Sequence, residues 1–216
     1  MITRLLLIFL LFLISCKSDK RYHDAGEVKE QDRSEVVADF NETITTLREE
    51  KDAVFRNADR SPLPDEERAN FEGLVYFSPD STYRVAARLE RAVLPKMIRM
   101  ETTTNEVMIQ QEYGELTFEL HGKTHRLKVY RDLELQRDPQ YENYLFLPFT
   151  DLTNGAETYG GGRYLDLTIP EADTLMLDFN KAYNPYCAYN SKYSCPLVPP
   201  ENHLEAAIRS GEQRYP

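Results

Sequence analysis

The stretch Leu116–Val129, which reads LTFELHGKTHRLKV, decides the fold of this chain. Apolar residues occupy every second position from Leu116 to Leu120, and Leu127 and Val129 repeat that spacing after an interruption. Alternation of this kind is typical of a strand with one buried and one solvated face. The interruption, His121–Thr124, contains a glycine, which readily adopts the positive φ of tight hairpin turns. The stretch therefore predicts two antiparallel strands joined by a short turn.

Strand patterns continue on both sides of this hairpin. A near-continuous apolar run, Tyr144–Phe149, predicts a central strand that is buried on both faces. The pair Tyr113–Gly114 predicts a turn before the hairpin. The remaining strands are predicted at Tyr83–Leu89, Met97–Met100, Val107–Ile109, Arg163–Ile169, Leu175–Phe179 and His203–Ile208. The sum is a mainly β domain of about eight antiparallel strands, which a β-sandwich and a partly open barrel fit equally well.

The residues before the strands divide into three segments. Residues 1–15 contain one arginine and an unbroken apolar run, Leu5–Ile14, which is the pattern of a secretory signal peptide. Residues 16–33 are charged and nearly devoid of apolar side chains, which predicts a flexible tether. Residues 34–60 carry apolar residues at steps of three and four, which predicts one helix packed against the β domain of residues 61–216.

The end of the signal segment, Leu13–Cys16, resembles a bacterial lipobox, in which the cysteine becomes the first mature residue and carries the lipid. The alternative is an ordinary signal peptide, or a short membrane anchor, with an incidental cysteine. Lipidation of Cys16 would hold the domain to a membrane of the bacterial cell envelope, outside the cytoplasm.

The charge and the cysteine content narrow the classes of partner. The chain has 36 acidic and 26 basic residues and a formal net charge of −10. An acidic balance without basic runs argues against nucleic acid as a partner. With Cys16 set aside, Cys187 and Cys195 form an even remainder, which in an oxidising compartment favours one disulfide over two free thiols.

Polar and aromatic residues are densest in two stretches near the C-terminus, Leu147–Leu167 and Leu177–Leu197. We expect a site there for a small polar ligand, a glycan or a peptide, because tyrosine rings beside Asp and Asn suit such ligands. The same residues can instead be structural, since short polar side chains replace backbone hydrogen bonds where strands end. The candidate ligand-binding residues are Asp151, Tyr159, Arg163, Asp178, Asn180, Asn184 and Tyr189.

Two of these candidates have specific alternatives. Asp151 either accepts backbone N–H groups in an Asx turn or presents its carboxylate to a ligand as an anchor or general base. Arg163 follows three glycines and either binds an anion or pairs internally with Asp166 or Asp178. No metal-ligand cluster and no nucleotide fingerprint accompanies them, so we expect neither a metal nor a cofactor.

A catalytic function has less support in the sequence. Cys187, His203 and Asn202 have the residue types of a thiol nucleophile, its base and an orienting group. A disulfide would consume that nucleophile. The second hypothesis is therefore an envelope hydrolase that acts on carbohydrate or peptide through the cluster around Asp151 and Arg163.

Three motifs fill the C-terminal third of the chain. They are LPFxDxTxGxxTYxxGRYL at Leu147–Leu165, LDFNxAYNPxCAYN at Leu177–Asn190 and CPLxPPENxL at Cys195–Leu204. These motifs resemble the domain-of-unknown-function 1684 family, and the resemblance extends over roughly residues 45–213. Other branches of that family open the domain with a Trp-rich segment, where this chain has Phe71–Leu74. The resemblance implies an exported or lipid-anchored protein and implies no activity.

Overall fold

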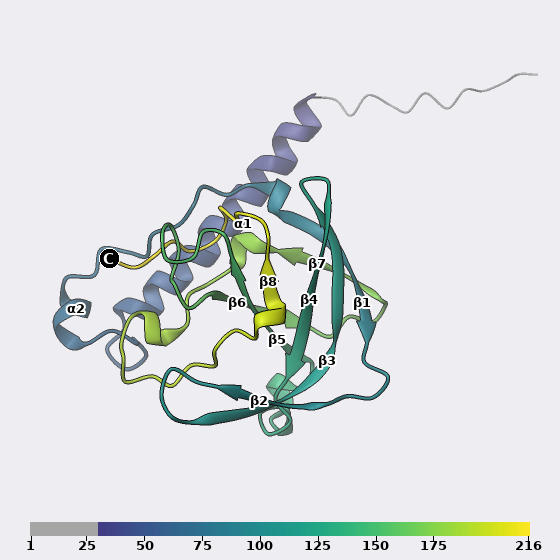
Figure 1. The fold of residues 1–216 in the computed structure, drawn as a ribbon. Helices are drawn as coiled ribbons and strands as arrows, with labels where there is room; N and C mark the ends of the chain where they lie inside the picture. The colour runs from purple at the N-terminus through teal and green to yellow at the C-terminus, as the bar shows by residue number, and fades with distance from the viewer. Residues whose placement is uncertain (1–29) are drawn as a thin grey trace, which may run out of the picture.

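The computed structural model describes residues 30–216, with side chains from residue 38 onward. These residues form one curled, half-barrel sheet of eight mostly antiparallel strands with an N-terminal helix packed against it (Figure 1). The predicted mainly β fold with one N-terminal helix is confirmed, and the architecture is the partly open barrel. The predicted signal segment, Cys16 and most of the predicted tether lie outside the described residues.

The strand order differs from the chain order at one edge of the sheet. The order is β6-β5-β4-β3-β1-β7, with β2 paired to β3 and β8 paired to β5. Among the described pairs, only β5 with β8 is parallel. The strands are β1 Arg84–Arg91, β2 Met97–Glu101, β3 Val107–Leu120, β4 Lys123–Arg131, β5 Tyr144–Asp151, β6 Arg163–Thr168, β7 Thr174–Asp178 and β8 His203–Leu204.

The β3–β4 hairpin has the predicted turn. Its two strands pair Leu116 with Leu127, and the chain reverses at His121 and Gly122. These two residues have φ of 49° and 74°, the left-handed region that a two-residue hairpin turn needs.

The predicted turn at Tyr113–Gly114 is wrong, because β3 continues through these residues. Glu112 pairs with Tyr130 of β4, and Gly114 pairs with the next residue of β4, Val129. One residue of β3 is therefore extra, which is a β-bulge. A glycine fits there because a Cβ at position 114 would collide with the backbone carbonyl of Glu90 in the adjacent strand.

The bulge changes the face of the sheet on which the side chains of β3 lie. Side chains alternate between the two faces, so one extra residue reverses the alternation beyond it. Leu116, Phe118 and Leu120 accordingly lie in the main core, whereas Gln110 lies on the opposite face. One strand thus supplies both the core and a second, smaller face.

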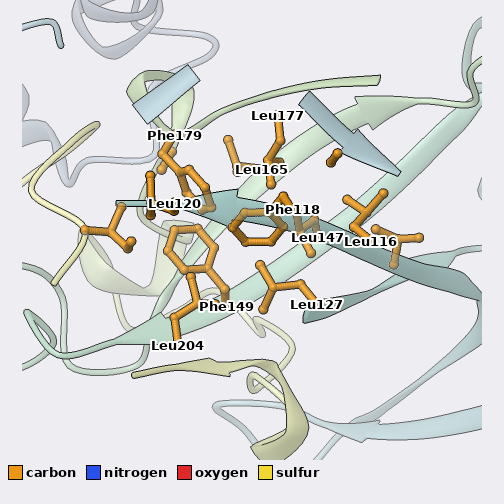
Figure 2. Packing of buried hydrophobic residues seen from close by; sticks show 14 of the residues in the cluster. Leu116, Phe118, Leu120, Leu127, Leu147, Phe149, Leu165, Leu177, Phe179 and Leu204 are labelled. Atoms are coloured by element: carbon orange, nitrogen blue, oxygen red, sulfur yellow. The ribbon is translucent and has the colours of Figure 1, made fainter. Parts of the chain in front are cut away.

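The main core lies on one face of the sheet (Figure 2). Its labelled members are Leu116, Phe118, Leu120, Leu127, Leu147, Phe149, Leu165, Leu177, Phe179 and Leu204. A smaller cluster contains Met100, Tyr130, Phe146 and Tyr164. Since Leu145 and Leu147 belong to the first cluster and Phe146 to the second, β5 is buried on both faces, as predicted.

The helix α1, Glu30–Arg56, buries Phe40, Ile44 and Phe55. The Phe55 ring stacks on the Phe71 ring with 5.6 Å between the ring centroids, and it meets the Tyr189 ring edge-on with 4.8 Å between the centroids. The helix begins four residues before Ser34, inside the predicted tether. A short helix, α2, Asp65–Ala69, follows it. Neither described helix is long and apolar enough to cross a membrane.

Candidate functional site

Asp151 and Arg163 form a buried ion pair between the end of β5 and the start of β6. They are 3% and 0% exposed, and Arg163 Nη2 lies 2.9 Å from Asp151 Oδ2. Burial lowers the pKa of Arg163, and the Asp151 carboxylate opposes that effect. Asp151 Oδ1 also accepts hydrogen bonds from the backbone and hydroxyl of Thr153, which is the Asx-turn arrangement. The internal partner of Arg163 is therefore Asp151, and not Asp166 or Asp178, the partners named in one of the two alternatives from the sequence.

The other donors of Arg163 hold the C-terminal segment. Nη1 donates to the carbonyl oxygens of Ser210 and Glu212, and Nη2 donates to that of Ile208 at 2.7 Å. Both Nη groups of the guanidinium are thus held by protein acceptors, whereas Nε is buried and has no hydrogen-bond partner in the described structure. The contacts of Asp151 and Arg163 support a structural role.

The glycines before Arg163 allow the tight return into β6. Gly155 and Gly162 have φ of +82° and +91°, so alanine is strained at both positions. At Gly162 a Cβ would also lie 2.7 Å from the carbonyl oxygen of Phe149, whereas at Gly155 it would meet nothing within 4 Å.

We expect Gly162→Ala to lower the free energy of unfolding by about 2–4 kcal/mol, because overpacking adds to the backbone strain. Gly155→Ala serves as the matched control, with strain alone, and should cost about 1 kcal/mol. Urea denaturation of both variants measures the difference. Equal losses would contradict the close packing of Gly162 against β5.

Asp178 and Asn180 connect the end of β7 to the loop before β1. Asp178 Oδ1 accepts from the backbone and side-chain N–H groups of Asn180. The Asn180 amide in turn exchanges two hydrogen bonds with the backbone of Asp80, at 2.8 and 2.9 Å. These polar atoms replace ladder bonds where the strand ends.

Asn184 and Tyr189 converge on a buried carboxylate that the sequence analysis missed. Glu212 is 1% exposed and accepts hydrogen bonds from the backbone N–H of Asn184 and the hydroxyl of Tyr189. It also forms a salt bridge with Lys51 of α1. This carboxylate ties α1, the segment after β7 and the C-terminus together.

Tyr159 lies beside the two cysteines. Its hydroxyl is 3.7 Å from Cys187 Sγ, and the Cys187 backbone N–H donates to Cys195 Sγ at 3.1 Å. Both cysteines are free thiols, so the disulfide stays a prediction. The hydrogen bond with Cys195 lowers the pKa of Cys187 to about 6, although burial opposes it. Burial and the thiol of Cys187 raise the pKa of Tyr159 to about 12.

The residues of the suggested thiol site have other partners. The Asn202 side chain bonds the backbone of Lys128 and of Pro148, and His203 Nδ1 lies 3.0 Å from the hydroxyl of Thr150. These contacts do not connect either residue to Cys187. Within residues 30–216, no cluster of three or more His, Cys, Asp or Glu side chains could hold a metal ion.

A pocket of about 580 Å³ lies on the face of the sheet opposite the main core. Its lining comes from strands β3, β5 and β6, from Asp132 and Leu135 after β4, from residues 183–196 and from Lys51 of α1. This volume falls within the range of small-molecule sites. We call it the tyrosine pocket, after its lining residues Tyr144, Tyr164, Tyr183, Tyr186 and Tyr193.

Asp166 is the acidic centre of the β6 side of the tyrosine pocket. Its Oδ1 accepts hydrogen bonds from the hydroxyls of Tyr144 and Tyr183, at 2.8 and 2.6 Å. Burial raises the pKa of both phenols, and the Asp166 carboxylate raises it further. The phenols therefore stay protonated and point their donors at this carboxylate, whose residue is exposed.

Gln110 gives the tyrosine pocket a buried polar group without a partner. The residue is 3% exposed, and its Nε2 donates to Asp132 Oδ2 at 3.1 Å. Its Oε1 has no hydrogen-bond partner in the described structure. A buried amide oxygen without a partner costs free energy, which a ligand donor would recover.

None of the seven predicted ligand-binding residues lines the tyrosine pocket. The alternation in β5 and β6 contained part of the signal, since Tyr144 and Phe146 share one face and Tyr164 and Asp166 the same face. Gln110 carried no such signal, because the bulge reverses the alternation between it and the core positions of β3.

The geometry defines a class of protein, a half-barrel β domain with an N-terminal helix and an aromatic pocket outside the main core. The chain belongs to the family described as "Protein of unknown function (DUF1684)", which matches residues 69–213. The family predicted from the three motifs is thereby confirmed.

A solved structure supports the same assignment. The chain is similar to the solution NMR structure of the uncharacterized protein from gene locus rrnAC0354 of Haloarcula marismortui. The two sequences are 37% identical, the TM-score is 0.63, and the similarity covers 83% of this chain and 97% of that one. No curated protein matches the chain.

Proposed function

We propose that this protein binds a small polar ligand in the tyrosine pocket, on a domain that a lipid at Cys16 anchors to a membrane of the bacterial cell envelope. The observation that carries the ligand proposal is the unpaired Oε1 of Gln110. Concave sites lined by aromatic rings with a few convergent polar groups are the usual form of small-molecule sites.

The geometry favours binding over hydrolysis. A hydrolase acting through the sequence-predicted cluster needs a carboxylate free to take a proton or a guanidinium free to hold an anion. Asp151 and Arg163 are instead committed to each other and to backbone groups. The proposed site is therefore the tyrosine pocket, and not the cluster around Asp151.

The test compares two neighbouring glutamines on opposite faces of β3. Gln110→Leu removes the unpaired acceptor, and Gln111→Leu is its control, because Gln111 bonds Arg131 and does not line the pocket. Binding of sugars, dipeptides and small amines to the full chain in detergent is measured by calorimetry. We expect Gln110→Leu to weaken binding about tenfold and Gln111→Leu to leave it unchanged. Equal affinities in the two variants, or no binding by any probe, would remove the proposal.

The anchor has its own test. Wild-type protein should sediment with the membrane fraction of the expressing bacterium, and Cys16→Ser should release it, because the lipid is attached at that sulfur. Cys187→Ser is the matched control and should stay with the membrane. Retention of the Cys16→Ser protein in the membrane fraction would show that something other than a lipid holds it there.

A further inference from the structure

The polar groups around Gln110 and Asp166 in the tyrosine pocket leave acceptors, and not donors, for a ligand. Gln110 Oε1 is unpaired, and its Nε2 is already committed to Asp132. The hydroxyls of Tyr144 and Tyr183 are committed to Asp166. A ligand that satisfies Gln110 must therefore donate a hydrogen bond.

The charged side chains of the tyrosine pocket also favour a ligand that donates hydrogen bonds. Asp132 and Asp166 both line it, and neither forms a salt bridge with a residue of the described chain. Asp132 receives only neutral donors, from Gln110 and the backbone of the turn that follows it. Lys51 is the one basic residue of the lining, and Glu212 neutralises it. Two carboxylates are thus left without a cation.

The aromatic walls also suit a cation. The Tyr164 ring stands nearly perpendicular to the rings of Phe146 and Tyr183, with interplanar angles of 78° and 88°. Aromatic faces attract cations, and enclosures of aromatic rings recognise ammonium groups. The chain itself uses one of these rings in this way, because Lys51 Nζ lies 4.6 Å from the centroid of the Tyr183 ring.

We infer that the ligand of the tyrosine pocket is a small organic cation, an amine or a guanidine on a compact carbon frame. This inference rests on the proposed function and narrows it. The cationic group donates to Gln110 and the carboxylates, and its carbon frame packs on the tyrosine rings. A neutral sugar satisfies the acceptors but leaves the two carboxylates uncompensated.

The experiment titrates the full chain in detergent with five probes that differ in charge. Putrescine and agmatine are cations, butanediol is the neutral counterpart of putrescine, succinate is an anion, and glucose is a neutral sugar. Calorimetry should give the cations an affinity about tenfold or more above that of butanediol. Higher salt should weaken the cations selectively, because it screens the attraction to the carboxylates.

Asp166→Asn removes one carboxylate charge and keeps an oxygen for the two phenols, and Asp173→Asn changes the same charge outside the pocket lining. We expect Asp166→Asn to bind the cations about tenfold more weakly than the wild type and Asp173→Asn to bind them with unchanged affinity. If glucose, butanediol or succinate binds more tightly than the cations and Gln110→Leu weakens it, the cation inference falls and the proposed function stands. If no probe binds, both fall. Equal cation affinity in the two Asp variants overturns the inference alone.

Discussion

Asp151→Ala is expected to lower the free energy of unfolding by about 3–5 kcal/mol, because it leaves the Arg163 guanidinium buried without its counter-charge. Arg163 is fully buried, and its remaining partners are backbone carbonyls, which cannot neutralise the positive charge. The same substitution also removes the carboxylate oxygen that accepts hydrogen bonds from the backbone N–H groups of Thr153 and Ile208. Chemical denaturation monitored by circular dichroism measures the loss.

Two variants separate the buried charge from other effects. Glu157→Ala breaks the exposed pair with Arg209 and should change stability very little, because solvent screens that pair. Adding Arg163→Met to Asp151→Ala removes the isolated charge and should recover part of the lost stability. If Asp151→Ala unfolds at the same denaturant concentration as Glu157→Ala, the ion pair contributes nothing to the fold.

Glu212→Ala is expected to cost about 3–5 kcal/mol, because three separate donors lose one buried acceptor. The backbone N–H of Asn184 and the hydroxyl of Tyr189 would remain buried without a partner, and Lys51 would lose its counter-charge. Thermal and urea unfolding should both report the loss.

A double-mutant cycle measures how much the salt bridge between Lys51 and Glu212 contributes to the free energy of unfolding. Lys51→Met alone leaves Glu212 charged and buried, whereas Lys51→Met with Glu212→Gln leaves a neutral pair that still accepts from Tyr189. We expect the double variant to be more stable than the sum of the single losses predicts. Strict additivity would mean that Lys51 and Glu212 do not interact in solution.

Much of the fold could be predicted because it depends on local patterns. The alternation around His121–Gly122 determines the hairpin, and the apolar run at Tyr144–Phe149 determines the central strand. The bulge at Gly114 could not be predicted in this way. The glycine there is required by the close approach of the Glu90 carbonyl from another strand, and a single strand's pattern does not contain that contact. A glycine after an aromatic residue reads equally well as a turn.

The candidate site was harder to predict because two kinds of structure concentrate polar residues. Asp151 pairs with Arg163 and Asp178 with Asn180, and both pairs use their polar atoms in hydrogen bonds inside the protein. The tyrosine pocket instead combines residues from six separate segments, among them Gln110 and Asp166, and no single stretch carries its signature. Residue density therefore located the buried network rather than the pocket.

The bulge in β3 makes the length of that strand as important as its composition. Six positions separate Gln110 from Leu116, so a strand of the same length without the bulge would place both side chains on the apolar face. Loss of Tyr113 would instead remove the extra residue and keep Gln110 on the pocket face, because Glu112 and Gly114 already pair with consecutive residues of β4. A leucine or methionine at position 110 would leave the register unchanged. A relative that lacks one residue at the bulge should therefore pair β3 with β4 regularly and keep position 110 on the pocket face, whereas a relative of the same length without the bulge should lose that polar group from the pocket.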